Sequence, residues 1–146
     1  MEGTGGKTTY HGPGQKIIYP IISLSYFNYD IKIFVYKLES FIINLLKHYN
    51  IDSYRIHNQR GVWVNILGNH YKIAAIGIRV RKWVAYHGIS ININNDLTKY
   101  RNIVACGLKY KQTSIEALGV DVSGEDFLNR FNLLIPSEFK KVINNI

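Results

Sequence analysis

Two side chains of this sequence are suited to nucleophilic chemistry. Cys106 is the sole cysteine of the chain and stands directly before Gly107. A thiol reacts as its thiolate, so it needs a neighbour that favours the charged form. Lys72 is a candidate, because it stands directly before the apolar stretch 73–77, where its charge would lose water. A desolvated lysine has a lowered pKa and acts as a base or ion-pair partner. Spacing alone leaves two alternatives open, a buried structural cysteine and a lysine whose charged end reaches solvent.

A second candidate motif fails on its context. Gly6-Lys7-Thr8 resembles the end of a phosphate-binding loop, G-x-x-x-x-G-K-[ST]. The first glycine of that pattern would fall on Met1, and the sequence predicts neither a strand before the motif nor a helix after it. We therefore exclude nucleotide phosphate binding at this position.

The five histidines show no spacing of three or four residues from one another, so no metal site is expected. His48 and His57 flank the end of a predicted helix and are expected in solvent. His11 and His87 each precede a glycine, which allows a backbone to approach a ligand closely. Two histidines in ordinary turns are the alternative.

The elements that position these residues follow from hydrophobic periodicity and turn signals. Asp30 is the predicted N-cap of a long amphipathic helix that ends near Tyr49. Strands are expected at 62–66, 71–80 and 83–93, the first two joined as a hairpin through 67–70, and at 16–24, where Pro20 favours an edge or a bulge.

The C-terminal third is expected to be helical. A capping box at Thr113-Ser114-Ile115-Glu116 predicts a short helix that stops at Gly119, and Ser123 with Asp126 predicts another near 125–134. Pro136 permits one more. Strands before short helices, with one long helix between, favour an α+β fold over a doubly wound sheet.

Length and composition limit the class of protein. The chain has 146 residues, with 18 Lys and Arg against 10 Asp and Glu, and a formal charge of +8. These values favour one domain over residues 1–146, and no apolar run approaches the ~18 residues of a membrane span. The positive charge suits nucleic acid, an acidic protein partner or nothing beyond solubility. Because basic residues cluster only at 79–82 and 109–111, we do not expect a nucleic-acid partner.

Five stretches carry a resemblance to a known family, and they occur in this order: Gly5-Gly6-Lys7-Thr8-Thr9-Tyr10-His11-Gly12-Pro13-Gly14-Gln15, Gly61-Val62-Trp63-Val64, Lys72-Ile73-Ala74-Ala75-Ile76-Gly77, His87-Gly88-Ile89-Ser90-Ile91-Asn92 and Ala105-Cys106-Gly107-Leu108. In this order and spacing the chain resembles the lipoyl(octanoyl) transferases, the octanoyl-acyl carrier protein:protein N-octanoyltransferases of lipoate biosynthesis. The resemblance runs from about residue 5 to about residue 119.

The resemblance implies an α+β fold with a mixed or antiparallel sheet packed by helices, of the biotin/lipoate protein ligase catalytic-domain type. It also implies a cytoplasmic acyltransferase. A cysteine takes octanoyl from octanoyl-acyl carrier protein, and the acyl group passes to a lysine of a lipoyl domain in 2-oxo acid dehydrogenase complexes or glycine cleavage H protein. Because a thioester is already activated, no ATP or other cofactor is expected.

On the matching positions, the resemblance makes Cys106 the acyl-thioester nucleophile and Lys72 the group that lowers its pKa and exchanges protons. It builds the acyl-substrate pocket from Thr4, Gly5, Gly6, Lys7, Thr8, Thr9, Tyr10, His11, Ala75, Ile76, Gly77, Gly88, Ile89 and Ser90. From the residue types we further expect apolar lining from Ile73, Ile76, Ile78, Ile89 and Ile91, oxyanion contacts at Gly77, Gly88 and Gly107, and an acidic partner at Arg79, Arg81 and Lys82.

The sequence departs from the family at its start. Thr4 stands where the family usually has an arginine, and family members carry several dozen residues before this loop, so we expect a shortened octanoyltransferase domain. Two alternatives stay open. One is an inactive remnant that only binds acyl carrier protein or a lipoyl domain, and the other is an ATP-dependent lipoate ligase-like enzyme.

Overall fold

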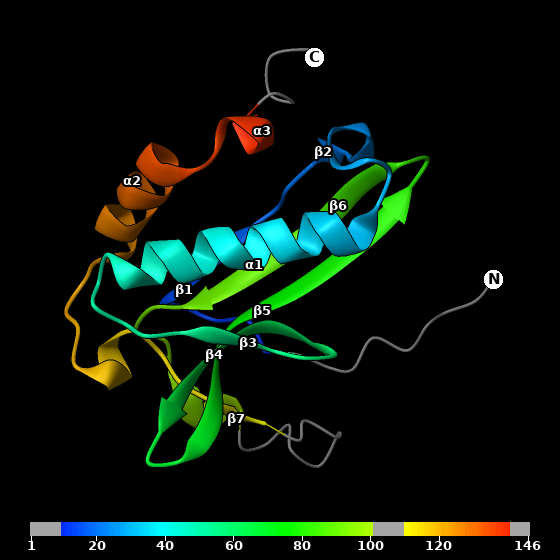
Figure 1. Cartoon of the computed structure of the whole chain (residues 1–146). Coiled ribbons are helices and arrows are strands. Elements are labelled where there is room, and N and C mark those ends of the chain that lie inside the picture. The colour runs from blue at the N-terminus through cyan, green and yellow to red at the C-terminus, as the bar shows by residue number, and fades with distance from the viewer. Residues whose placement is uncertain (1–9, 101–109, 141–146) are drawn as a thin grey trace.

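The computed structural model describes residues 10–100 and 110–140. The helices are α1 (Ile31–Lys47), α2 (Gly124–Leu134) and α3 (Ser137–Lys140), and the strands are β1 (Gln15–Ile18), β2 (Ile22–Ser23), β3 (Tyr54–Ile56), β4 (Gln59–Ile66), β5 (Asn69–Arg81), β6 (Val84–Asn92) and β7 (Lys111–Gln112). The strands form one sheet in the order β1-β6-β5-β4-β3, along which α1 lies, with α2 and α3 beyond it (Figure 1). β2 pairs with β6, and β7 pairs with β5.

Every strand pair is antiparallel except β5 with β7, so the sheet is mixed, as predicted for the α+β class. The β5–β6 hairpin is the longest ladder and runs from Ala74 opposite Ile91 to Arg81 opposite Val84. β7 pairs at Tyr71 and Lys72, just before the β6 ladder begins. The first residues of β5 are therefore bordered by β4 and by β7.

The long helix begins and ends nearly where the sequence predicts. The Asp30 Oδ1 accepts hydrogen bonds from the amides of Lys32 at 2.7 Å and Ile33 at 3.4 Å, which satisfies two donors of the first turn. The buried side chains of α1 recur at three- and four-residue steps and pack into one core with the sheet. The members from α1 are Phe34, Val35, Leu38, Phe41, Ile42, Leu45 and Leu46.

The predicted strand 16–24 is split. Pro20 separates β1 from β2, both of which lie at the edge beside β6, and the residues on either side of Pro20 turn outward. Tyr19 is 69% exposed and Ile21 60% exposed, so the expectation of a buried strand is wrong at this point, while the edge position that Pro20 favours is confirmed.

Of the two predicted caps in the C-terminal third, one is correct. The Ser123 Oγ accepts a hydrogen bond from the Asp126 amide at 3.0 Å and caps α2. The Thr113 capping box is wrong in its cap residue, because the Ser114 Oγ accepts instead, from the Ala117 amide at 3.1 Å. The element that follows is a single 3-10 turn, Glu116–Leu118, which ends at Gly119 with a φ of 85°.

α3 follows Pro136 and lies against α1. The Nζ of Lys37 lies 3.4 Å from the Oε1 of Glu138, and the Phe139 ring packs against Phe27 and Phe34 in the core. Among the helices of the described ranges, none combines the length and the hydropathy of a membrane-crossing segment.

Candidate active site

Lys72 lies near the start of β5, and its side chain packs against two aromatic rings. Its Nζ is 4.6 Å from the ring centroid of Trp63 and 5.4 Å from that of Tyr110, and Trp63 itself is fully buried. Burial lowers the pKa of Lys72 below the ordinary lysine value, because desolvation disfavours the ammonium form. Among the described residues the ion pairs are Lys37–Glu138 and Arg55–Glu39, so no carboxylate of this part of the chain offsets that effect.

A bulge gives Lys72 its position. The register between β4 and β5 shifts between Val62 opposite Ala74 and Trp63 opposite Lys72, so β5 holds one extra residue, Ile73. Gly61 makes room beside the lysine: a Cβ built there would lie 3.3 Å from the Lys72 Cε and 2.6 Å from the Ala74 carbonyl oxygen. With a φ of 118°, this position is suited to glycine.

β7 brings a distant stretch of chain to the lysine. Lys72 is opposite Gln112 in the parallel pairing, and the Thr113 amide donates to the Lys72 carbonyl oxygen at 2.9 Å. Tyr110, just before β7, packs edge-to-face on Trp63 at 4.9 Å between ring centroids. Cys106 precedes Tyr110 by four positions in the sequence and, with Gly107, lies outside the described residues.

The residues of β5 and β6 that were predicted to line an acyl pocket are divided between the two faces of the sheet. Ala75, Gly77, Gly88 and Ser90 occupy two cross-strand pairs, Ala75–Ser90 and Gly77–Gly88. Ile76 and Ile89, which form the pair between them, belong to the buried core, so by strand alternation the other four face the opposite side. Ile76 and Ile89 thus offer only their backbone to a ligand on that side.

The side chains of the five isoleucines expected to line an acyl pocket therefore lie on the core side of the sheet, and their role as a lining stays a prediction. Ile73, Ile76, Ile78, Ile89 and Ile91 are all buried in the core cluster that α1 covers. The opposite side of the β5–β6 hairpin, around Gly77, carries little side-chain bulk. A Cβ built at Gly77 meets no heavy atom within 4 Å, and one at Gly88 meets the Tyr19 ring at 3.6 Å.

A polar network that the sequence reasoning missed ties this region together. Asn92, which is 2% exposed, accepts at its Oδ1 from Gln15 Nε2 at 2.8 Å, Asn95 Nδ2 at 3.2 Å and Tyr100 OH at 3.2 Å. Its Nδ2 donates to the Thr113 carbonyl oxygen at 2.9 Å. The end of β6 is thereby joined to β1 and to the residues that follow β7.

Tyr10 and His11 connect to the same network. His11 Nδ1 lies 2.7 Å from Gln15 Oε1, the Tyr10 carbonyl accepts from Tyr100 OH at 3.4 Å, and the two tyrosine rings meet edge to face. Burial raises the pKa of Tyr100 above the ordinary tyrosine value. Thr4, Gly5, Gly6, Lys7, Thr8 and Thr9, the rest of the predicted loop, lie outside the described residues.

Other expectations concern the surface. His48 and His57 are exposed, and no group of three metal-ligating side chains occurs in residues 10–100 and 110–140.

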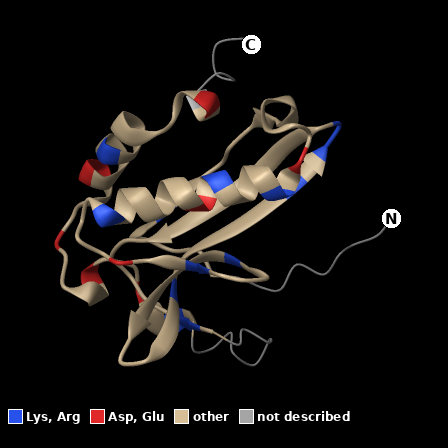
Figure 2. Cartoon of the chain, in the orientation of Figure 1, with Lys and Arg blue, Asp and Glu red and all other residues tan. Residues whose placement is uncertain are grey.

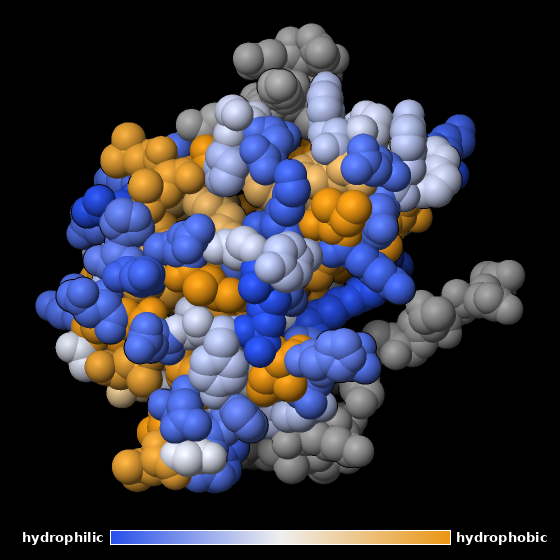
Figure 3. Space-filling model, in the orientation of Figure 1, coloured by the Kyte–Doolittle hydropathy of each residue, from blue (hydrophilic) through white to orange (hydrophobic). Residues whose placement is uncertain are grey.

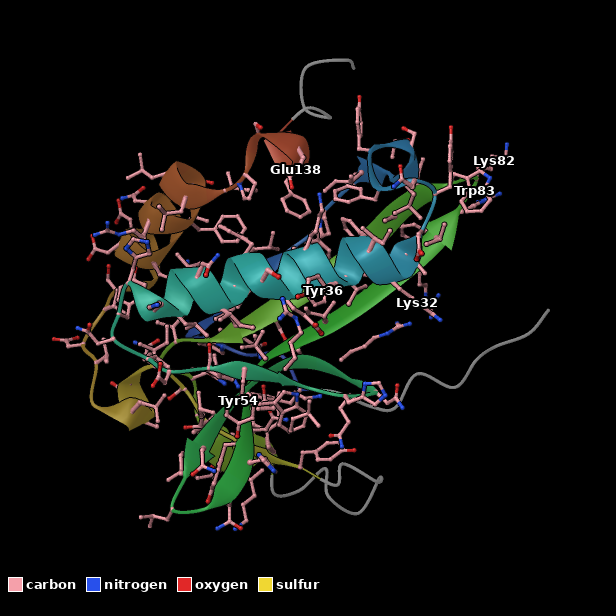
Figure 4. The ribbon with its side chains drawn as sticks, in the orientation of Figure 1. Lys32, Tyr36, Tyr54, Lys82, Trp83 and Glu138 are labelled. Carbon is pink, nitrogen blue, oxygen red and sulfur yellow. The ribbon has the colours of Figure 1, made fainter. Side chains whose placement is uncertain are left out.

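Arg81 and Lys82 lie at the tip of the β5–β6 hairpin, where Figure 2 shows basic residues and Figure 4 shows Lys82 beside Trp83. On the α1 side, hydrophilic residues run across the middle of the molecule between hydrophobic patches (Figure 3).

Comparison with known proteins defines the class. The family model of the lipoyl protein ligase A/B catalytic domain matches residues 2–133, and the chain belongs to this family. Its curated relatives are octanoyltransferases: those of Rickettsia canadensis and Rickettsia prowazekii are each 46% identical over 144 residues, which is 96% of this chain and 67% of the relative. This level of identity indicates an acyltransferase.

Solved structures agree on the fold. A bi-partite lipoate protein ligase from Thermoplasma acidophilum is similar with a TM-score of 0.65 and 18% identity, over 94% of this chain and 55% of that protein. Biotin protein ligase from Aquifex aeolicus is similar with a TM-score of 0.66 and 16% identity, over 90% of this chain and 56% of that protein. The chain thus spans little more than half of these ligases, and the ligase-type catalytic-domain fold is confirmed.

Proposed function

We propose that this chain transfers octanoyl from acyl carrier protein to a lysine of a lipoyl domain, through a thioester on Cys106. The identity to octanoyltransferases supports octanoyl transfer in lipoate biosynthesis as the activity. The observation that carries the proposal is the half-buried Lys72, whose pKa is lowered and whose neighbour Tyr110 follows Cys106 by four positions. Four residues of chain reach at most about 14 Å, so this sequence separation suits a Cys106–Lys72 dyad.

In the first step the Cys106 thiolate attacks the thioester carbonyl of octanoyl-acyl carrier protein. The new carbon–sulfur bond forms, the old one breaks, and the phosphopantetheine thiolate leaves and takes up a proton. A lysine that exchanges protons easily suits this step. In its ammonium form it stabilises the Cys106 thiolate, and it then supplies the proton that the leaving phosphopantetheine thiolate takes up.

In the second step the amine of the acceptor lysine attacks the acyl-cysteine. An amide forms, the Cys106 thiolate is released, and the proton of the amine passes to Lys72, which has become neutral. Burial favours that neutral state, since it lowers the pKa of Lys72. The lipoate ligase and octanoyltransferase relatives support a lipoyl domain as the acceptor. The cytoplasm is the compartment we propose for both substrates.

The test is intact-protein mass spectrometry after mixing with octanoyl-loaded acyl carrier protein, with Cys106→Ser as the matched variant. One octanoyl adduct that hydroxylamine removes, and that the variant lacks, supports the thioester step. Transfer of the adduct to an added lipoyl domain supports the second step. An adduct-free but folded protein contradicts the proposal and favours a binding remnant, while octanoate- and ATP-dependent modification of a lipoyl domain by Cys106→Ala favours a ligase-like enzyme.

A further inference from the structure

The side of the β5–β6 hairpin that faces away from the core has a floor of small residues. We call the cross-strand pairs Ala75–Ser90 and Gly77–Gly88 the acyl floor. Gly77 is exposed, and a Cβ built on it meets nothing within 4 Å. The floor is therefore open at Gly77 and offers backbone for a chain-like ligand to lie on.

The floor stops at the next pair on the same face. Arg79 is opposite Tyr86, and both side chains are large. Tyr86 is half-buried, and its ring stacks on that of His87, with 5.3 Å between centroids and 27° between planes. We call Arg79, Tyr86 and His87 the end wall.

The backbone of His87 makes this stack possible. Neighbouring residues of a regular strand point to opposite faces, so Tyr86 and His87 would be on different sides of the sheet. His87 has a φ of 84°, in the left-handed region, and its exposed side chain lies against the Tyr86 ring rather than in the core. Such backbone strain is unfavourable and is concentrated at ligand sites, which suggests a function for the stack.

We propose that the end wall sets the longest acyl chain that the enzyme accepts. This rests on the proposed function, which places an acyl thioester on Cys106 and pairs that residue with Lys72. Lys72 lies at the other end of the floor. Its Cε is 3.3 Å from the position that a Cβ of Gly61 would take, and Gly61 directly precedes Val62, the strand partner of Ala74. From the Ala75–Ser90 pair to the Arg79–Tyr86 pair is four residues, or about 13 Å along a strand, which suits an extended eight-carbon chain.

The chemistry of the wall fits this role. Stacked aromatic rings offer an apolar surface to a terminal methyl group, and each buried methylene changes affinity about fourfold. A longer chain would have to displace the rings or pass the exposed, charged Arg79. A shorter chain would leave the end of the floor in water.

Four variants test the wall. Tyr86→Ala removes one ring, and His87→Gly removes the other while it keeps the left-handed backbone free of strain. Tyr86→Phe is the matched control, because it keeps the ring. Gly77→Val fills the floor at a position where an added Cβ meets no heavy atom within 4 Å, so the variant is expected to fold. Circular dichroism checks each fold.

The measurement is competition between hexanoyl-, octanoyl- and dodecanoyl-loaded acyl carrier protein, read as relative adduct formation by intact mass. We expect Tyr86→Ala and His87→Gly to raise the dodecanoyl-to-octanoyl ratio about tenfold. We expect Tyr86→Phe to leave it unchanged and Gly77→Val to favour hexanoyl. Unchanged ratios in Tyr86→Ala, His87→Gly and Gly77→Val, from a protein that is acylated, overturn the proposal.

A second readout separates this proposal from the proposed function. Binding of free octanoate and dodecanoate, followed by tryptophan fluorescence, needs no thioester chemistry. If no variant is acylated, the proposed function fails. The wall is then supported by tighter dodecanoate binding to Tyr86→Ala than to Tyr86→Phe, and overturned by equal binding.

Discussion

The Nζ of Lys72 lies 4.6 Å from the ring centroid of Trp63. An indole face attracts a cation, whereas burial without a carboxylate disfavours one, and burial is the cause of the lowered pKa of Lys72. The aromatic ring thus allows a lysine to remain in an apolar place, while its proton is held less tightly than in water. This is the property that a proton-exchanging group in an acyltransferase requires.

We expect Lys72→Met to stabilise the protein near pH 7 while it abolishes acyl-enzyme formation. Below the lowered folded pKa, Lys72 is charged in both states, and the folded protein bears the full penalty of burying the charge. Between that pKa and the unfolded value of about 10.4, the unfolded state binds more protons, so stability of the wild type rises with pH.

The gain of Lys72→Met should therefore shrink as pH approaches about 10. Urea unfolding at several pH values measures it, with the exposed Lys82→Met as the matched control, which should show no such dependence. A variant that is less stable than the wild type at neutral pH would show that Lys72 is not desolvated.

We expect Gly61→Ala to lower the free energy of unfolding by about 3 kcal/mol, since it combines a strained φ with a close approach to the Ala74 carbonyl oxygen. Gly68→Ala is the control, because Gly68 also has a positive φ, 82°, but open space around it, and should cost about 1 kcal/mol. Chemical denaturation compares the two. Equal losses would mean that the close approach of residue 61 to the Ala74 carbonyl oxygen does not add to the destabilisation.

We expect Asn92→Ala to destabilise the protein by about 2–3 kcal/mol, because it leaves the carbonyl of the buried Thr113 near β7 without its donor and removes one acceptor of the half-buried Gln15 in β1. The neighbouring Asn94 is exposed, so Asn94→Ala should change stability by less than about 0.5 kcal/mol. Hydrogen exchange of the Thr113 amide, which donates to Lys72, should also accelerate in Asn92→Ala. Unchanged exchange would mean that the network does not hold β7 in place.

We expect Arg55→Lys to destabilise the protein by about 1–2 kcal/mol, although the charge is kept. The Arg55 guanidinium lies 3.9 Å from the Tyr36 ring centroid, its Nε is 3.2 Å from Glu39 Oε2, and it donates to the Tyr36 carbonyl and to Ser40 Oγ. Glu39 in turn accepts from the Gly61 amide at 3.0 Å. Thermal unfolding with exposed Arg60→Lys as control measures the effect, and equal melting temperatures would contradict it.

The parts of the fold that local signals determine were predictable. α1 carries both its cap, Asp30, and its apolar period within one stretch, so its bounds follow from the sequence. β3 and β7 were missed because strands of three and two residues exist only through their partners. Nothing near Lys111 in the sequence signals a parallel pairing with Tyr71.

The candidate site was predictable in its residue types and not in its geometry. The family resemblance singles out Lys72, Gly77 and Gly88, but which face each residue occupies depends on the side that α1 covers and on the bulge at Ile73. The Asn92 network was missed for a similar reason, since Gln15 and Tyr100 meet it through the fold, and amide side chains carry no distinctive spacing.

The pairing of β1 with β6 has a consequence for folding kinetics. Gln15 and Asn92 are partners across 77 positions, whereas β4, β5 and β6 are joined by tight hairpins. Because long loops are closed slowly, the hairpins should form first and β1 should join the sheet last. Tyr10 and His11 lie next to β1 and are joined to it through Gln15, so these two residues take up their places beside Tyr100 only in the final step of folding.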